Sequence, residues 1–394
     1  MNVEVDNSKA NTSAARVAQV VCFVLLCGIL TAGLWPFHAP RNGAEWIEGA
    51  GGLVFQPYTT LVSTGAFGAR SVAENSCTLK IIMSSGPGRK GTILAFADPA
   101  HPEAAFALRQ MGSNLALQRY EVSADGQVTQ PWLTVENVFD SGPVFITITG
   151  GKNGTRVYRN GVLAASASYF GMKRGDLTGR LVLGTSLRND SWTGTIFGLA
   201  FSSIEMDRAE VASDRFGDAS GNWDAIYRFD ERSGNVAHNA IDSGTDLLIP
   251  SHYQVLEKPF LQRPWEQYRH TWSGAYHFSY WQDVIVNVAG FLPVGFCFAG
   301  LFCMIPDWRR PFAATAIFGF LLSLTIEVLQ WFLPTRNSSL TDVLTNTLGT
   351  CLGLMLYRST VGQIVWRQAL SLGLAILGCE GPDSGSDDTV SLAA

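Results

Sequence analysis

The chain has 394 residues, of which 47% are hydrophobic and only 15% are charged, and its formal net charge is −5. Soluble domains average about 25% charged residues, so this composition excludes a disordered chain, a fibrous repeat and an ordinary cytosolic enzyme. An acidic chain also lacks the basic surface that nucleic-acid binding requires, so no nucleic-acid partner is expected.

Five apolar segments are candidate membrane spans, because a spanning helix needs about 20 mostly apolar residues. The first, 17–37, is interpreted as an uncleaved anchor, since its apolar run exceeds the roughly 7–15 residues of a signal peptide. The other four are 281–306, 311–334, 340–357 and 361–378, which together predict a membrane domain over 280–378. An N-terminal stretch, 1–16, precedes the first span, and an acidic tail, 379–394, follows the last.

Basic residues near the span ends predict the orientation of the chain. Arg16, Arg309, Arg310 and Arg358 all lie on the cytoplasmic side if the N-terminus is cytoplasmic. Five spans then place the acidic tail outside. The same orientation places the long region between the first two spans outside the cytoplasm.

That region, 42–265, has the alternating pattern of short β-strands separated by Gly, Pro, Asn and Asp. The clearest part is a meander of 144–149, 155–158 and 162–164, in which Asn160-Gly161 favours a type I′ hairpin turn. Such spacing predicts an antiparallel sandwich of two sheets with a C-terminal extension. Cys77 is the region's only cysteine, so the sandwich depends on its core rather than on an internal disulfide.

The meander also carries a family resemblance. Its Thr149, Gly154, Val157, Tyr158 and the Asn160-Gly161 turn resemble the concanavalin A-like, laminin-G-type jelly roll over roughly 50–205. The resemblance implies a glycan or protein ligand, often with Ca²⁺. No acidic cluster has the spacing of a Ca²⁺ loop and no histidine–cysteine set has that of a zinc site, so no cofactor or metal is assigned. A folded spacer without a ligand is the alternative.

Several polar residues interrupt the apolar segments. A charge within a span costs at least about 2–3 kcal/mol and persists where it has a partner, a proton or a water-filled pocket. The segments that begin at 283 and 342 both read Asp-Val-x-x-Asn-x-x-Gly, which indicates either an internal duplication or a shared packing constraint. We expect the polar set to lie in the outer half of the membrane: Asp283, Asn287, Glu327, Gln330, Arg336, Asp342 and Asn346.

The order of these residues resembles the VanZ-like membrane family. The motifs are Asp283-x3-Asn287-x5-Pro293-x-Gly295, then Ser323-x3-Glu327-x2-Gln330-x3-Pro334-x-Arg336, then Ser339-x2-Asp342-x3-Asn346-x2-Gly349. The family takes its name from a protein that confers resistance to the glycopeptide teicoplanin. The resemblance implies a multi-pass bacterial inner-membrane protein of the cell envelope, from which this chain departs by its inserted sandwich.

Two functions follow from the sequence. One is an envelope protein whose outward-facing sandwich binds a glycan or an envelope protein, with the membrane polar residues capping helices and bonding across them. The alternative is a membrane enzyme or transporter for a lipid-linked or anionic envelope component. In that alternative Arg336 attracts phosphate or carboxylate and Glu327 is the general acid or base. The sequence carries no nucleophile elbow, metal cluster or phosphate loop, which favours binding over catalysis.

Overall fold

A computed structural model describes most of the chain and divides it into two compact units. One unit joins Met1–His38 to Pro259–Ala394, and the other is Ala39–Lys258. The described residues are 2–49, 51–68, 76–97, 106–119, 121–122, 128–140, 142–185, 190–213, 216, 223–241, 244–256, 258–264, 274–306 and 308–376. The acidic tail predicted at 379–394 lies outside them.

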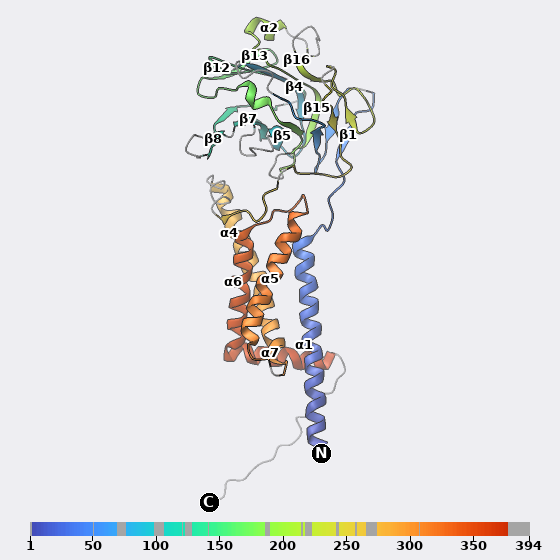
Figure 1. The fold of residues 1–394 in the computed structure, drawn as a ribbon, viewed down its shortest axis with the longest axis vertical. Coiled ribbons are helices and arrows are strands. Elements are labelled where there is room, and N and C mark those ends of the chain that lie inside the picture. The colour runs from blue at the N-terminus through green and yellow to red at the C-terminus, as the bar shows by residue number, and fades with distance from the viewer. Residues whose placement is uncertain are drawn as a thin grey trace, which may run out of the picture. The chain divides into compact units, whose positions relative to one another are not determined.

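The unit of residues 39–258 is a sandwich of two antiparallel sheets (Figure 1). The first sheet has the order β1 (Ala44–Trp46), β2 (Leu53–Phe55), β15 (Gly194–Ser202), β4 (Cys77–Ser85), β11 (Val144–Gly151), β12 (Gly154–Arg159) and β13 (Val162–Ala167). A further strand, β16 (Trp223–Tyr227), pairs with β15. The predicted meander is therefore confirmed as β11, β12 and β13, and Asn160 and Gly161 have the positive φ angles that the turn requires.

The second sheet faces the first across the core. Its order is β10 (Trp132–Val135), β7 (Asn114–Arg119), β6 (Phe106–Met111), β5 (Lys90–Ala97), β14 (Arg180–Leu183), β3 (Leu61–Ser63), β18 (Leu247–Leu248) and β17 (Val236–Ala237). A small ribbon of β8 (Glu121–Val122) and β9 (Val128–Thr129), a 3₁₀ turn η1 (Arg174–Leu177) and a short helix α2 (Arg208–Ser213) complete the unit.

Inward-facing side chains of both sheets form a single core. Strand β4 shows how the core forms, because side chains alternate between the two faces of a strand. Cys77, Leu79 and Ile81 lie in the core, and the residues between them face the opposite side of the sheet. Aromatic rings join the two sheets: the centroid of Phe201 lies 5.2 Å from that of Phe96 and 4.9 Å from that of Phe67.

The chain enters and leaves the sandwich at one place. The backbone N–H of Asn42 donates to the carbonyl of Ser251, and the N–H of Tyr253 donates to the carbonyl of Pro40. The first and last residues of the sandwich thus run side by side as a two-stranded stem.

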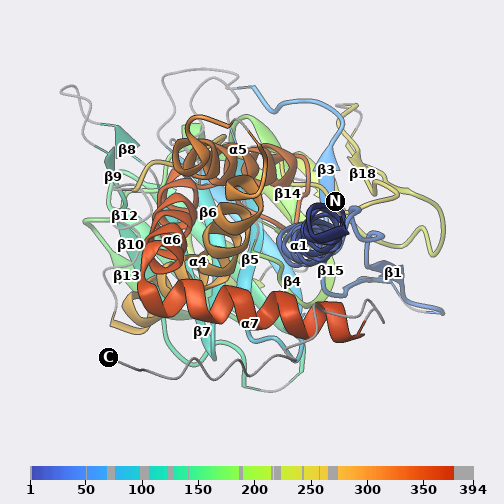
Figure 2. The ribbon, with the colours of Figure 1, turned by 90° about the horizontal axis from the view of Figure 1, so that it is seen from below.

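The second unit is helical. It contains α1 (Asn2–Leu34), α4 (Gly274–Cys303), α5 (Pro311–Trp331), α6 (Leu340–Arg358) and α7 (Thr360–Ile376). The first four run lengthwise beside one another, and α7 lies across them at one end (Figures 1 and 2). A cluster of apolar side chains from α1, α4 and α5 fills the centre, including Cys22, Phe291, Phe298 and Leu322.

The structure differs from the five predicted spans. Within the described residues, three helical segments are long and apolar enough to cross a membrane: Thr12–Leu34, Tyr280–Cys303 and Pro311–Trp331. Helix α6 packs lengthwise against α4, but its first half is rich in threonine and also contains Asp342 and Asn346. Helix α7 has 17 residues, lies crosswise, and is not among the three segments that are long and apolar enough to span.

The thiol of Cys77 gives a first test of the sandwich. Burial raises its pKa, and the side chain is fully enclosed in the core. Reaction needs both exposure and a thiolate, so we expect Cys77 in the folded chain to react with a maleimide on the order of 100-fold more slowly than after unfolding. Mass spectrometry of labelled peptides measures this, with the urea-unfolded chain as control. Equal labelling before and after unfolding would contradict a core position for Cys77.

Candidate functional site

Glu327 is the most deeply buried charge of the predicted polar set, with 1% of its surface exposed. It lies in the last turns of α5, and its Oε2 accepts a hydrogen bond of 2.7 Å from the backbone N–H of Ser339. Ser339 is the N-cap of α6, and its own side chain accepts from the N–H of Thr341. The carboxylate therefore lies at the positive end of the α6 dipole, where a negative charge is stabilised.

Asn346 lies below Glu327 on the same pair of helices. Its Nδ2 donates to the hydroxyl of Ser323 on α5 at 3.0 Å, and the side chain is 5% exposed. Its Oδ1 is buried and has no hydrogen-bond partner in the structure. The Asn346 amide thus joins α5 to α6 through its nitrogen, while its oxygen accepts no hydrogen bond from the described residues.

A second group lies between α4 and α6. Asp342, in the first turn of α6, lies near the side chains of Asn287 and Asp283 of α4. Asp283 is exposed and the other two residues are half-buried. The two Asp-Val-x-x-Asn-x-x-Gly segments therefore lie side by side, with the Asp of one copy near the Asn of the other.

Gln330 and Arg336 form a third group, which is directed at α1. The Gln330 amide donates to the carbonyl of Gly33 at 2.8 Å. The Arg336 guanidinium donates to the carbonyls of Ala32 and Trp35, each at 3.1 Å. These carbonyls belong to the C-terminal end of α1, which has no intrahelical donors for them and carries a partial negative charge.

The predicted polar set is therefore placed at one end of the helical unit, but it is divided among three contacts rather than gathered in one pocket. Ser323 and Ser339 belong to the sequence motifs, and the structure shows that they are the hydrogen-bond partners of Asn346 and Glu327. A preceding segment that no motif indicates also contacts the α5–α6 loop, because the N–H of Gln262 donates to the carbonyl of Ser338.

Glycines bring α4 and α6 into backbone contact. A Cβ added at Gly295 of α4 would lie 1.9 Å from the carbonyl oxygen of Thr350. Added at Gly349 or Gly353 of α6, it would lie 2.4 Å from the carbonyl of Val288 or 1.9 Å from that of Leu292. Small residues at such positions allow the close approach that helix pairs in membranes use in place of a hydrophobic driving force.

The repeated segment offers a matched test of this interface. Gly290 and Gly349 hold the same place in the two copies, but a Cβ at Gly290 meets nothing within 4 Å. Gly349→Ala forces backbone atoms apart at a cost of about 1–3 kcal/mol, so we expect a lower unfolding temperature in detergent. Gly290→Ala gains up to about 1 kcal/mol of helix propensity and should be neutral or stabilising. Equal effects of the two substitutions would contradict the close α4–α6 contact.

Glu327 can be tested by separating its charge from its hydrogen bond. Glu327→Gln retains an acceptor oxygen for the Ser339 N–H and should leave abundance and thermal stability near those of the parent chain. Glu327→Leu leaves a buried donor unsatisfied and should cost about 1–3 kcal/mol. Fluorescence-detected size exclusion after heating measures both. A Leu variant as stable as the Gln variant would show that Glu327 does not support α6, whereas loss of an envelope phenotype in a stable Gln variant would assign the charge a function.

The sandwich carries a groove that sequence analysis did not find. It has a volume of about 430 Å³ and lies between the β12–β13 hairpin and the segment that leads into α2. The residues lining it are Arg156, Tyr158, Leu163, Glu205, Met206, Asp207 and Arg208. Arg156 and Glu205 form an ion pair of 3.1 Å, each about one-third exposed or less, while Tyr158 is buried and Leu163 is 41% exposed.

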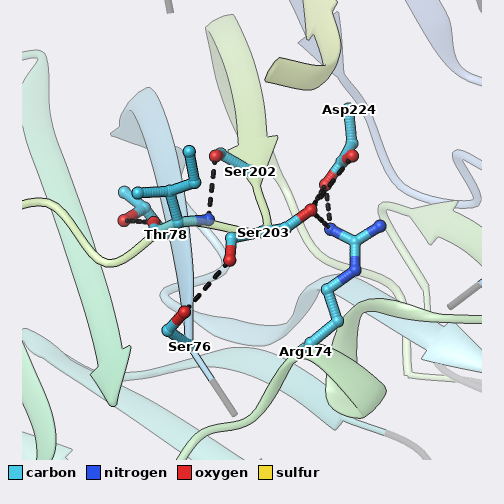
Figure 3. Close-up of polar contacts among 7 residues, drawn as sticks. Ser76, Thr78, Arg174, Ser202, Ser203 and Asp224 are labelled. Carbon is cyan, nitrogen blue, oxygen red and sulfur yellow. Dashed lines mark hydrogen bonds and ion pairs between the residues drawn. The ribbon is translucent and has the colours of Figure 1, made fainter. Parts of the chain in front are cut away.

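A second polar cluster in the sandwich is structural. Arg174 of η1 donates to Asp224 of β16 and to Ser203, whose hydroxyl donates to Asp224 at 3.0 Å (Figure 3). The hydroxyl of Ser76 donates to the carbonyl of Ser203 at 3.1 Å. These contacts hold β16 at the edge of β15. Because Arg174 and Asp224 are 50 positions apart, no local sequence pattern indicates the pair.

A neighbouring ion pair is also buried. Arg119 and Asp176 approach to 2.9 Å with side-chain exposures of 8% and 15%. Burial raises the pKa of the Asp176 carboxyl, although the guanidinium acts in the opposite direction. Among the described residues, no group of three or more His, Cys, Asp or Glu is arranged to hold a metal ion.

One part of the chain matches a known family model. Residues 228–365 match the VanZ/LLP1 family model. The chain carries a VanZ-like domain. The match contains all of the predicted polar residues of the membrane segments, and it begins within the sandwich unit, before β17, rather than at residue 280.

The sandwich is similar to carbohydrate-binding and laminin-G-type domains. A putative carbohydrate binding protein from Bacteroides ovatus is 13% identical over 53% of this chain and 58% of its own, with a TM-score of 0.36. The mouse laminin alpha1 LG4-5 domains are 13% identical over 44% and 48%, with a TM-score of 0.30. The botulinum neurotoxin serotype D binding domain is 14% identical over 44% of each chain, also at 0.30. The chain thus spans about half the length of these structures, and no curated protein matches it.

Proposed function

We propose that this VanZ-like protein is a bacterial inner-membrane component of the cell envelope, and that its sandwich lies outside the cytoplasm and binds a glycan. The helical unit is the anchor in this proposal. The groove between β12–β13 and α2 is the binding site, and its lining is the observation that carries the proposal.

The chemistry of the groove suits a sugar. Glu205 and Asp207 offer acceptors for hydroxyl groups, and Arg156 and Arg208 offer donors. Leu163, which is 41% exposed, and the half-buried Met206 provide apolar surface for the C–H face of a sugar ring. A shallow site with both kinds of surface is appropriate for a ligand that is polar at its edge and apolar on its face.

Basic residues support the proposed orientation. Arg309 and Arg310 lie between α4 and α5, and Arg358 ends α6, so all three belong to the end of the helical unit opposite the chain connections to the sandwich. The positive-inside preference assigns that end to the cytoplasm. Residues 39–258, which connect the other ends of α1 and α4, are then extracytoplasmic.

The alternative, a membrane enzyme or transporter for an anionic envelope component, depended on Arg336 as the anion-binding group. Two donor groups of Arg336 are engaged by α1 carbonyls, and Glu327 bonds to the α6 N-terminus. Helix capping accounts for both residues, so the alternative has less support than glycan binding. A resistance role is a separate proposal that rests on the VanZ-like match alone.

Binding can be measured with the full chain in nanodiscs on an array of bacterial envelope polysaccharides. We expect binding above that of empty nanodiscs. Glu205→Ala and Arg208→Ala should each weaken it about tenfold or more, as for loss of a hydrogen bond to a charged group. Arg159→Ala is the matched control, because Arg159 lies on the same strand but pairs with Asp140 outside the groove lining. Absence of binding would refute the glycan proposal, and equal weakening by all three variants would refute the groove as its site.

A further inference from the structure

Helix α7 follows α6 with only Ser359 between them and turns sharply away from its direction. It then crosses the neighbouring helices and reaches α1 (Figure 2). Its packing is tight at three points: Gly362 against the carbonyl of Leu356, Trp366 against Gly300, and Gly373 against Val17.

These contacts place both ends of α7 at the same end of the helical unit. Leu356 lies in the last turn of α6, Gly300 in the last turn of α4, and Val17 near the start of the apolar segment Thr12–Leu34 of α1. Contacts near the ends of three helices hold α7 at one level along the bundle. Helix α7 does not return toward the opposite end.

Three rows of side chains run along α7. The packed row contains Gly362, Trp366 and Gly373. A second row is apolar and exposed, with Leu372 at 64% and Ile376 at 75%; its other members are Val361 and Val365. The third row is mainly polar and contains Gln363, Arg367 and Ser371, with the half-buried Leu374 among them. Ile364, which is 52% exposed, lies between this row and the apolar row. At 100° per residue the apolar row is centred about 90° from the packed row on one side, and the polar row is centred about 120° from it on the other.

The direction of α7 decides which row faces which way. Figure 2 is seen along the long helices of the bundle, and in it α7 runs from α6 toward α1. The contacts of Gly362, Trp366 and Gly373 show that the packed row faces the other helices. The right-handed winding of an α-helix then places the polar row toward the viewer, beyond the helix ends. The apolar row is placed on the side of the spanning segments.

Basic residues surround this end of the bundle. Arg358 lies over the ring of Phe312 at 5.2 Å, which brings the start of α5 to the end of α6. Arg309 and Arg310 immediately precede α5, and Arg367 belongs to the polar row of α7. Such residues complement anionic lipid headgroups.

We propose that α7 lies in the plane of the membrane at its interface, with the apolar row in the hydrocarbon and the polar row among headgroups and water. The occupant of its exposed face is the lipid bilayer. The chain beyond Ile376 then remains on the same side of the membrane as the N-terminus, in place of the outer side that five spans predicted. This proposal is independent of glycan binding by the sandwich.

The first test is the location of the C-terminus. A reporter that is active only in the cytoplasm is fused to either terminus of the full chain, and a second reporter that is active only outside the cytoplasm is fused at the same points. We expect both termini to give the same result. Opposite results for the two termini would show that α7 spans and would overturn the proposal.

The second test measures the depth of the two rows. An environment-sensitive fluorescent amino acid is introduced at Leu372 or at its neighbour Ser371 in the full chain, which is placed in nanodiscs that contain lipids brominated along the acyl chains. We expect severalfold stronger quenching at position 372, because only the apolar row contacts the hydrocarbon. Similar quenching at both positions would mean that α7 is either fully inserted or away from the bilayer, and would overturn the proposal. Lipids without bromine provide the baseline for each variant.

Discussion

The arrangement of the helical unit depends on the contact between the backbones of α4 and α6. Gly295, Gly349 and Gly353 leave room for carbonyl groups of the opposite helix at distances that any side chain would prevent. The closeness has chemical consequences, because it brings the Asp342 carboxylate near the side chain of Asn287. It also presents Thr350 to Gly319 of α5, so that the third helix packs against the pair that the glycines create.

Polar residues in the membrane segments act mainly where helices end. A helix leaves unpaired N–H groups at its start and unpaired carbonyls at its end, and these are costly where water is scarce. Glu327 satisfies the start of α6, while Gln330 and Arg336 satisfy the end of α1. These three residues lie within ten positions of one another, in α5 and the loop that follows it. They therefore hold both α6 and α1 against this part of the chain. A charge that is expensive in a membrane is retained because the alternative is an unsatisfied helix terminus.

The part of the fold that depends on local signals could be predicted from the sequence. The β11–β13 meander follows from alternation and the Asn160-Gly161 turn, and the spans at 280–303 and 311–331 follow from hydropathy. The crosswise position of α7 could not be predicted by a count of apolar residues, because that count ignores how they are distributed around the helix. The groove at Arg156 and Glu205 joins residues 49 positions apart, which only the pairing of the strands brings together.

For the polar residues of the membrane segments too, local sequence predicts some features and packing decides the others. Spacing predicted a common depth for Glu327, Asp342 and Asn346, and the structure has Glu327 near the end of α5 and the other two near the start of α6. Spacing did not indicate their partners, since Ser323 and the backbone of Ser339 are ordinary residues whose role depends on packing. The repeated Asp-Val-x-x-Asn-x-x-Gly segment is instructive, because Gly349 contacts a neighbouring backbone while Gly290 does not. Identical local sequence therefore serves different contacts in the two copies.

The stem of the sandwich explains how a large domain can be inserted in a helical membrane unit. Residues 40–42 and 251–253 are hydrogen-bonded to each other, so the sandwich begins and ends at nearly the same point. An insertion with adjacent ends requires only a short separation between the helices that it joins. Helix α1 is held to α5 by the contacts of Gln330 and Arg336, which do not involve the inserted residues. The helical unit therefore holds α1 in place through its own contacts, and the sandwich has its own core. Substitutions in one unit can then leave the internal contacts of the other unit intact.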